Sequence, residues 1–166
     1  MVGPAVALLP EADRPEIRHQ AGENTYGVAE IAYRRAGVQA HLQSFITDMA
    51  EAYGWADLVI ARSGALTVAE LAAAGVGAIL VPYPAAVDDH QTRNAAYLVN
   101  AGAATLIPES ELDAKRLAAE LQQRIADRAL ILKQAQRART QAMPDATADI
   151  VARCLAVSLA GMHSDA

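Results

Sequence analysis

The segment Ala61-Arg-Ser-Gly-Ala-Leu-Thr-Val-Ala-Glu70 joins a short apolar run, Leu58–Ala61, directly to the start of a helix. A second apolar run, residues 78–81, leads through Pro82-Tyr-Pro84 to another polar helix start at Asp88-Asp-His-Gln91. Apolar runs that alternate with helical segments are typical of a parallel α/β sheet. Both helices begin at the carboxyl ends of their strands, which is the edge where open α/β sheets bind ligands.

The rest of the chain extends this alternation in both directions. We expect strands over residues 16–20, 41–46, 58–61, 78–81 and 104–107. We expect helices over residues 25–36, 48–53, 67–74, 90–100, 113–126, 129–142 and 146–159, and the end of a further helix over residues 6–9. Gly37 and Gly75 fit the C-terminal caps of two of these helices. The order predicts an α/β fold, a Rossmann-like parallel sheet flanked by helices and joined by right-handed crossovers.

Size and composition agree with one domain. A chain of 166 residues has the size of an ordinary domain, which we place at residues 1–160 with a frayed tail at 161–166. The chain is 53% hydrophobic but only 4% aromatic, which predicts a core of Ala, Leu, Val and Ile. A net charge of −5 gives no reason to expect a nucleic-acid partner. Basic residues between Lys115 and Arg139 are interrupted by Glu120 and Asp127, which favours a solvated helix face over a membrane-binding patch.

The cysteine count and the hydropathy pattern indicate a cytosolic chain. The lone Cys154 forms no internal disulfide, which suits a reducing compartment, and its apolar helical neighbours predict a buried thiol. No run reaches the roughly 18 apolar residues of a membrane span. No basic segment precedes an apolar run at the N-terminus, so we expect no signal peptide.

Thr67-Val-Ala-Glu70 supports two interpretations. It fits a capping box, in which the Thr67 side chain caps the helix and Glu70 reaches back to the Thr67 N–H. Alternatively, the paired oxygens of Glu70 accept hydrogen bonds from two ribose hydroxyls. From the residues alone, the cap is favoured.

The preceding turn, Ser63-Gly64, also has a structural and a functional interpretation. Gly64 would supply backbone freedom for a tight turn from strand to helix. The N–H groups of Ala65, Leu66 and Thr67 would face a phosphate, because free amides at a helix start attract anions. Ser63 lies in no Gly-x-Ser-x-Gly elbow, which argues against a hydrolase nucleophile.

The second helix start again allows a cap, with Asp88 first and Gln91 three residues later. Gln91 carries both a donor and an acceptor, which suits recognition of vicinal sugar hydroxyls. Asp88, Asp89 and His90 are weak metal candidates, because adjacent helical residues point in different directions. His19, at the end of a predicted strand, is more easily explained as a structural histidine than as a general base.

Together these segments resemble the nucleotide-sugar half of the MurG family, the bacterial N-acetylglucosaminyltransferases that make lipid II. The resemblance covers nearly the whole chain in the family's order. It rests on Phe45-Ile-Thr-Asp-Met49, Arg62-Ser-Gly-Ala-Leu-Thr-Val-Ala-Glu70, Ala72-Ala-Ala-Gly75, Val81-Pro-Tyr-Pro84, Asp88-Asp-His-Gln91, Asn94-Ala95, Ala101-Gly-Ala103 and Pro144-Asp-Ala146. It implies the C-terminal half of a two-domain glycosyltransferase of the GT-B type.

The resemblance also implies roles for individual residues. Glu70 would hold the ribose of the UDP donor, the backbone of Ile46 would pair with uracil, and Gln91 would bind the N-acetylglucosamine hydroxyls. Asn94 lies one turn further along the same helix face. The expected substrate-binding residues are Ile46, Ser63, Ala65, Leu66, Thr67, Val68, Ala69, Glu70, Gln91 and Asn94. We expect no cofactor and no metal ion, and catalytic residues in the other domain.

The family's first strand, its Gly-Gly-Ser phosphate turn and its acceptor-holding domain have no counterpart in the sequence, which opens at Met1-Val-Gly-Pro4. We therefore expect a fragment, a truncated gene product or half of a split enzyme. The full enzyme would transfer N-acetylglucosamine from UDP-N-acetylglucosamine to undecaprenyl-diphospho-muramoyl-pentapeptide, with inversion. It would be cytoplasmic and peripheral on the inner face of the cell membrane.

Three alternatives remain open. The first is a related transferase with another lipid acceptor, and the second is a nucleotide-sugar epimerase on the same fold. The third is a partner-dependent donor subunit or a non-catalytic module that binds a UDP-sugar.

Overall fold

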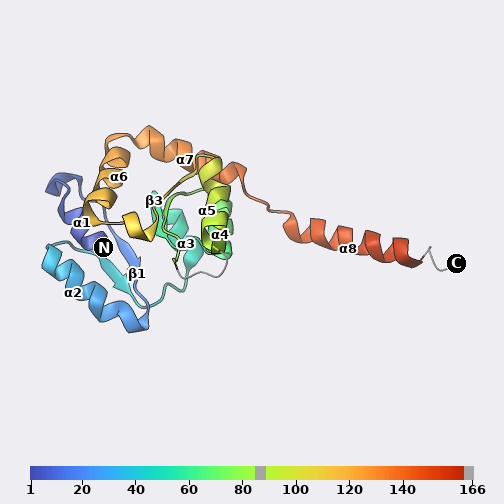
Figure 1. Cartoon of the computed structure of the whole chain (residues 1–166), viewed down its shortest axis with the longest axis horizontal. Coiled ribbons are helices and arrows are strands. Elements are labelled where there is room, and N and C mark those ends of the chain that lie inside the picture. Colours follow the sequence, from blue (N-terminus) through green and yellow to red (C-terminus); the bar gives the residue numbers. More distant parts are fainter. Residues whose placement is uncertain (85–88, 163–166) are drawn as a thin grey trace.

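The computed structural model describes residues 1–84 and 89–162, and side chains up to residue 157 (Figure 1). The strands in these ranges are β1 (Arg18–Gln20), β2 (His41–Gln43), β3 (Leu58–Ala61), β4 (Gly77–Leu80) and β5 (Ala104–Leu106). The α-helices are α1 (Val2–Ala7), α2 (Tyr26–Ala36), α3 (Met49–Trp55), α4 (Ala65–Ala74), α5 (His90–Asn100), α6 (Ala114–Ala126), α7 (Arg128–Thr140) and α8 (Ala146–Met162). Short 3-10 turns lie at Glu11–Asp13, Glu23–Thr25 and Glu109–Glu111. The predicted alternation of strands and helices is confirmed.

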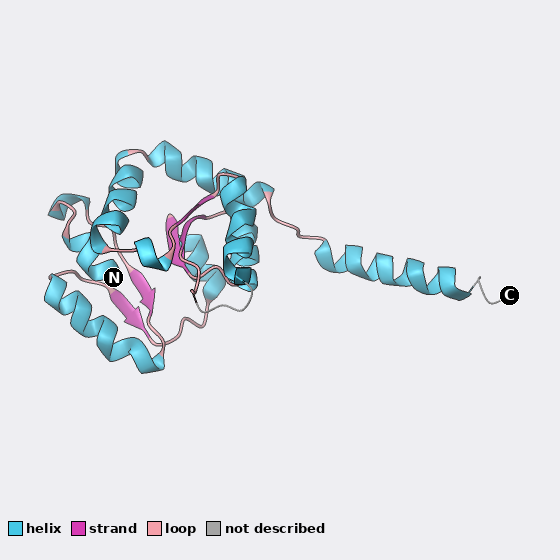
Figure 2. Cartoon of the chain, in the orientation of Figure 1, coloured by secondary structure: helices cyan, strands magenta, loops and turns pink. Residues whose placement is uncertain are grey.

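The described strands all pair in parallel, as predicted, but in two separate sheets (Figure 2). β1 pairs with β2 from Arg18 opposite His41, and the second sheet has the order β3-β4-β5. β4 lies in the centre of its sheet, and all of its residues are buried. β3 is paired along one edge only, and its apolar residues are half-buried. A continuous apolar run such as Ala78-Ile-Leu80 is typical of a parallel strand that is covered on both faces.

Helices cover both faces of the β3-β4-β5 sheet. α4 packs against α3, α5 and α7, whereas α1 packs against α2 and α6. Adjacent side chains of β4 enter different layers: Leu80 lies in the core with Leu71 and Leu98, and Ile79 lies in the core with Val6. This division follows from the strand period of two residues. The buried hydrophobic residues are aliphatic except for two tyrosines, which confirms the expected aliphatic core.

Two predicted helix caps are confirmed. Gly37 closes α2 with φ 63°, and Gly75 closes α4 with φ 72°. A side chain is strained in this left-handed region, and a Cβ on Gly75 would also lie 3.2 Å from the Arg139 side chain. Both glycines therefore serve the turn that redirects the chain toward the next strand.

The strand expected over residues 41–46 ends earlier than predicted, at Gln43. Gln43 and Ser44 still accept hydrogen bonds from the N–H groups of Ala21 and Gly22, at 2.8 and 3.1 Å. Beyond them, the N–H of Ile46 donates to a side chain instead of a strand backbone. The chain therefore leaves the sheet before Ile46 and turns toward α3.

The basic stretch is not a purely solvated face, because Arg124 is only 2% exposed. Its guanidinium donates to Gln134 Oε1 at 3.2 Å, to Thr105 Oγ1 at 2.7 Å and to Glu120 Oε2 at 2.7 Å. These partners lie on α7, β5 and α6. Arg124 thus joins two helices to the sheet, and the predicted solvated face is wrong at this position.

α8 projects away from the rest of the molecule (Figure 1). None of its described side chains belongs to either core, and Ile150, Val151 and Leu155 are exposed. Cys154 is exposed for the same reason, so the prediction of a buried thiol is wrong. The predicted frayed tail begins inside α8, and residues 163–166 lie outside the described residues. No helix within the described ranges is both long and apolar enough to cross a bilayer.

Candidate functional site

The turn between β3 and α4 is joined to the start of α5 by two hydrogen bonds. Ser63 is 0% exposed, and its Oγ donates to the backbone oxygen of Gln91 at 2.8 Å. In return, Asn94 Nδ2 donates to the backbone oxygen of Ser63 at 3.1 Å. The structure thus brings three of the predicted site residues together at the carboxyl ends of β3 and β4. We call this pair of bonds the Ser63 lock.

The side chain of Gln91 is fixed as well. Its Oε1 accepts a hydrogen bond from the N–H of Tyr83 at 2.9 Å. This contact uses the amide oxygen and not the amide nitrogen, and it holds the loop after β4 against the first turn of α5. Tyr83 was not singled out from the sequence, because the contact depends on the path of a loop.

The start of α4 differs from the capping box that the residues alone favour. The N-cap is Gly64, and the N–H of Val68 donates to the Gly64 oxygen at 3.0 Å, which closes the first turn. Thr67 therefore lies inside the helix, and its predicted cap role is wrong. Gly64 has φ −61° and ψ 149°, an extended conformation that any residue adopts, so the expected need for glycine freedom is also wrong.

Because the Val68 N–H is the first donor within the helix, the N–H groups of Ala65, Leu66 and Thr67 have no acceptor within α4. No side chain of the described residues caps them. The residues that carry these groups lie outside the core, since Ala65 is exposed, Thr67 is half-buried and Leu66 is 78% exposed. Val68 differs, because its side chain lies in the core and its N–H is used within the helix. Ala69 is an exposed position of the same helix.

Glu70 is exposed, and a tyrosine from a neighbouring helix binds its carboxylate. The hydroxyl of Tyr53, on α3, donates to Glu70 Oε2 at 2.9 Å. Burial raises the pKa of Tyr53 to about 12, and the hydrogen bond to Glu70 and its negative charge act in the same direction. Tyr53 is therefore a neutral donor at physiological pH. No sequence signal identified it, because the contact spans 17 residues and depends on how α3 packs on α4.

Ile46 lies where the chain leaves β2. Its N–H donates to Gln20 Oε1 at 2.9 Å. Two residues later, Asp48 caps α3 by accepting from the N–H of Glu51 at 2.8 Å. Arg18 of β1 then pairs with Glu51 at 2.7 Å. The segment after Ile46 is thereby tied to both β1 and α3.

Arg62, which precedes the Ser63 lock, binds the loop after β4. It donates to the backbone oxygen of Pro82 at 3.0 Å, and its guanidinium lies 5.4 Å from the ring centre of Tyr83. It also pairs with Glu109. Arg62 thus connects the end of β3 to two loops on the same edge of the sheet.

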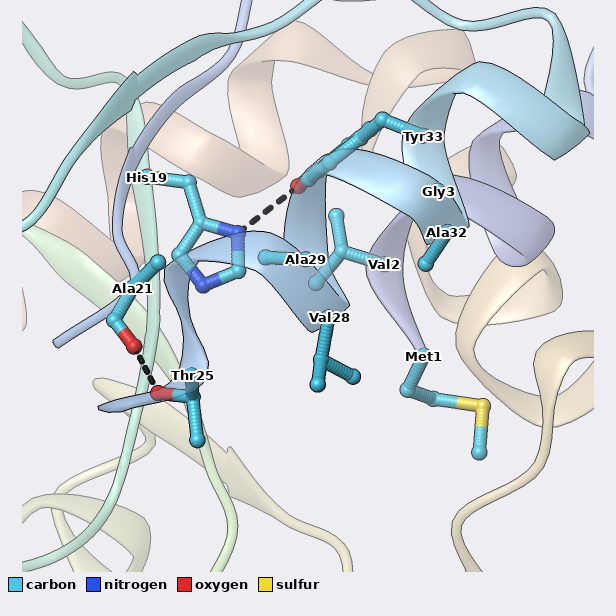
Figure 3. Close-up of a pocket in the computed structure, with 10 residues that line it drawn as sticks. All are labelled: Met1, Val2, Gly3, His19, Ala21, Thr25, Val28, Ala29, Ala32 and Tyr33. Atoms are coloured by element: carbon cyan, nitrogen blue, oxygen red, sulfur yellow. Dashed lines mark hydrogen bonds between the residues drawn. The ribbon is translucent and has the colours of Figure 1, made fainter. Parts of the chain in front are cut away.

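His19 lies in a different place, at a hollow between β1, α1 and α2 (Figure 3). Its Nδ1 is 3.1 Å from the Tyr33 hydroxyl, and the two rings meet edge to face. Burial lowers the pKa of His19, and the positive N-terminus lowers it further. The lining of this hollow includes none of the predicted substrate-binding residues.

Of the acidic residues predicted at the start of α5, the structure describes Asp89, whereas Asp88 lies outside the described residues. Asp89 is the N-cap of α5 with φ 52°, and no described side chain caps this helix. In residues 1–84 and 89–162, no three His, Cys, Asp or Glu side chains group in a way that could hold a metal ion.

A family model described as "Glycosyltransferase family 28 C-terminal domain" matches residues 2–150. Relatives from Marinobacter nauticus and Alkalilimnicola ehrlichii are 59% and 57% identical over 151 residues. Both are named UDP-N-acetylglucosamine--N-acetylmuramyl-(pentapeptide) pyrophosphoryl-undecaprenol N-acetylglucosamine transferase, and each match covers 91% of this chain and 42% of the relative. The crystal structure of MurG from Acinetobacter baumannii is similar with a TM-score of 0.82 and 40% identity, over 90% of this chain and 45% of that one. The chain therefore spans less than half the length of these relatives.

Proposed function

This chain belongs to the glycosyltransferase family 28 C-terminal domains, and on that premise we propose that it binds the UDP-N-acetylglucosamine donor of a glycosyltransferase. The names of its relatives support this donor, because they state an N-acetylglucosamine transferase that uses the UDP-sugar. The observation that carries the proposal is the Ser63 lock. It holds the starts of α4 and α5 side by side at the ligand-binding edge of a parallel sheet.

The donor's pyrophosphate would bind at the start of α4. Three N–H groups without intrahelical partners lie there, at Ala65, Leu66 and Thr67. The positive end of the helix dipole adds to their attraction for an anion. Backbone amides can supply this interaction without a basic side chain, which fits a chain of net charge −5.

The other parts of the donor would bind around this anchor. Glu70, five residues further along α4 than Ala65, would accept from the ribose hydroxyls. Gln91 would use its amide nitrogen on the sugar hydroxyls, because Tyr83 occupies only its oxygen. The backbone of Ile46 would bind uracil, and a uracil carbonyl would then replace Gln20 Oε1 as the acceptor of the Ile46 N–H.

We further propose that the full-length protein transfers N-acetylglucosamine to the lipid-linked N-acetylmuramyl-pentapeptide at the inner face of the membrane. The transfer would be a single displacement with inversion at the anomeric carbon. The amides at the start of α4 would stabilise the negative charge that develops on the departing UDP. This chain contributes the donor side of the reaction, and the acceptor would be held by the remaining part of the protein.

Titration of the purified chain with UDP-N-acetylglucosamine, UDP-glucose and UDP tests the donor assignment, by calorimetry and by amide NMR shifts. We expect UDP-N-acetylglucosamine to bind more tightly than the other two ligands. We also expect the largest shifts at Ala65, Leu66, Thr67 and Gln91. The assignment fails if none of the three ligands binds, or if the shifts gather around His19 and Tyr33 instead.

A second assay concerns turnover. Correct positioning of both substrates supplies about 7–11 kcal/mol of a displacement barrier, and this chain positions only the donor. We therefore expect residues 1–166 alone to form no lipid-linked disaccharide. Robust formation of the lipid-linked disaccharide by the purified chain would contradict the proposal that this chain binds only the donor. His19 and His90 would then be the first candidate bases to test.

A further inference from the structure

The contact between Tyr53 and Glu70 joins two helices at the proposed donor site. Tyr53 lies on α3 and Glu70 on α4, and the hydroxyl donates to Glu70 Oε2 at 2.9 Å. We propose that Tyr53 is a positioning residue for the donor ribose, which fixes the Glu70 carboxylate so that Oε1 is presented to a ribose hydroxyl. This inference rests on the proposed function, because it requires that Glu70 binds the ribose.

The need for such a residue follows from the exposure of Glu70. An exposed glutamate samples several rotamers, and fixing it upon binding costs free energy. In the described structure, Tyr53 holds one oxygen of the carboxylate before any ligand arrives. A carboxylate accepts up to about four hydrogen bonds, so the tyrosine leaves acceptor sites free on both oxygens. Part of the ordering cost is therefore met during folding.

The tyrosine can fix the carboxylate because it is itself held by packing. Its side chain is 9% exposed and packs in the core with Val68 and Leu71 of α4. The helix that carries it is anchored at both ends. Asp48 caps its first turn, and the guanidinium of Arg18 lies 4.3 Å from the ring centre of Trp55 in its last turn.

The chemistry of Tyr53 suits a constant hydrogen-bond donor. Burial raises its pKa to about 12, so the phenol keeps its proton over the whole physiological range. A phenolate would repel Glu70, and that state is avoided. A phenol also donates a single hydrogen bond, which gives the carboxylate one defined orientation.

α3 also connects two parts of the proposed donor site. Ile46, the uracil candidate, lies just before its Asp48 cap, and Tyr53 lies near its end. The helix therefore places the base-binding backbone and the ribose-binding carboxylate at a fixed separation. We infer that Tyr53 contributes mainly to recognition of the ribose, and little to recognition of the pyrophosphate.

The test is Tyr53→Phe, which keeps the ring in the core and removes only the hydroxyl. Tyr97→Phe is a matched control, because the Tyr97 hydroxyl also donates a 2.8 Å bond, but to the backbone of Gln141. Binding of UDP and of 2′-deoxy-UDP is measured for the parent, for both variants, for Glu70→Ala and for the Tyr53→Phe, Glu70→Ala double variant.

We expect Tyr53→Phe to weaken UDP binding by about three- to tenfold, the range of one hydrogen bond, and to reduce the preference for UDP over 2′-deoxy-UDP. The same change in the Glu70→Ala background should have no further effect. Tyr97→Phe should leave both affinities unchanged.

Three outcomes overturn the inference in different ways. If the parent binds UDP and discriminates against 2′-deoxy-UDP, and Tyr53→Phe does the same, the tyrosine only supports helix packing and the proposed function stands. If Tyr53→Phe weakens binding equally with and without Glu70, its effect does not pass through the carboxylate. If the parent binds neither ligand, the proposed donor site itself is wrong, and the positioning role fails with it.

Discussion

Ser63→Ala separates the contribution of the Ser63 lock from that of the helices it joins. The substitution removes the hydroxyl that donates to the Gln91 backbone oxygen at 2.8 Å and keeps the backbone oxygen that accepts from Asn94. Ser63 is completely buried, so water cannot take the place of the lost hydroxyl without a local rearrangement. The variant therefore tests one bond of the lock at a time.

The expected magnitude follows from the burial of the two partners. A net hydrogen bond contributes about 0.5–1.5 kcal/mol, whereas a loss that leaves a buried acceptor without its donor costs about 1–3 kcal/mol instead. Gln91 is only half-buried, so part of the second cost is offset by hydration of its carbonyl. We expect a total loss of about 1–2 kcal/mol. For a chain of this length, that corresponds to a fall in Tm of about 2–8 °C.

Calorimetric unfolding and a titration with UDP-N-acetylglucosamine check both consequences. Ser110→Ala is the matched control, because Ser110 is exposed in the 3-10 turn Glu109–Glu111. The donor should bind more weakly to Ser63→Ala, because the start of α5 is released from the α4 turn. Equal Tm values for Ser63→Ala and Ser110→Ala would refute the role given to the lock.

Gln91→Ala should weaken the binding of UDP-N-acetylglucosamine and leave UDP binding nearly unchanged, as measured by calorimetry. If both ligands bind more weakly to the same degree, Gln91 does not contact the sugar. Arg124→Ala should cost about 1.5–3 kcal/mol in urea unfolding, because it removes the buried donor to Gln134 and Thr105, while Glu120 keeps its ion pair with Arg116. The exposed Arg128→Ala should change little. His19 has a pKa lowered by burial, so the unfolded chain binds more protons below pH 6.5 and stability falls as the pH drops through that range. His19→Gln should flatten this pH dependence of Tm, and an unchanged profile would contradict it.

Local signals in the sequence were sufficient for most elements. β3 and α5 have the predicted bounds, because an apolar run or an amphipathic pattern with clear ends defines each of them. The caps at Gly37 and Gly75 are local as well, since the left-handed position after the C-terminus of a helix strongly favours glycine. These features depend on neighbours within a few residues, which a single sequence contains.

The errors came from interactions between distant segments. Thr67 and Glu70 matched a capping box, but α4 begins at Ala65 and Glu70 bonds to Tyr53. The thiol of Cys154 was expected to be buried, but α8 adds no described side chain to either core. In each case the local pattern was real, and the outcome depended on which element packs beside it.

In the candidate site, too, the sequence predicted the local features but not the contacts between distant segments. Ser63, Gln91 and Asn94 were expected near one another, and the two bonds of the lock do join them. The bonds themselves were not predicted, because they link a turn to a helix 28 and 31 residues away. Ligand contacts for these residues stay a prediction, and the titrations above address them.

The single tryptophan of the chain, Trp55, is at the end of α3, where its indole is 37% exposed beneath the Arg18 guanidinium. Its fluorescence responds to the polarity and to the cation around it. The emission therefore comes entirely from the helix that links Ile46 to Glu70 through Tyr53. The protein thus carries an intrinsic optical probe on the helix that connects the proposed base-binding and ribose-binding residues. A stopped-flow record of its emission would test, without any added label, whether that helix responds to a nucleotide.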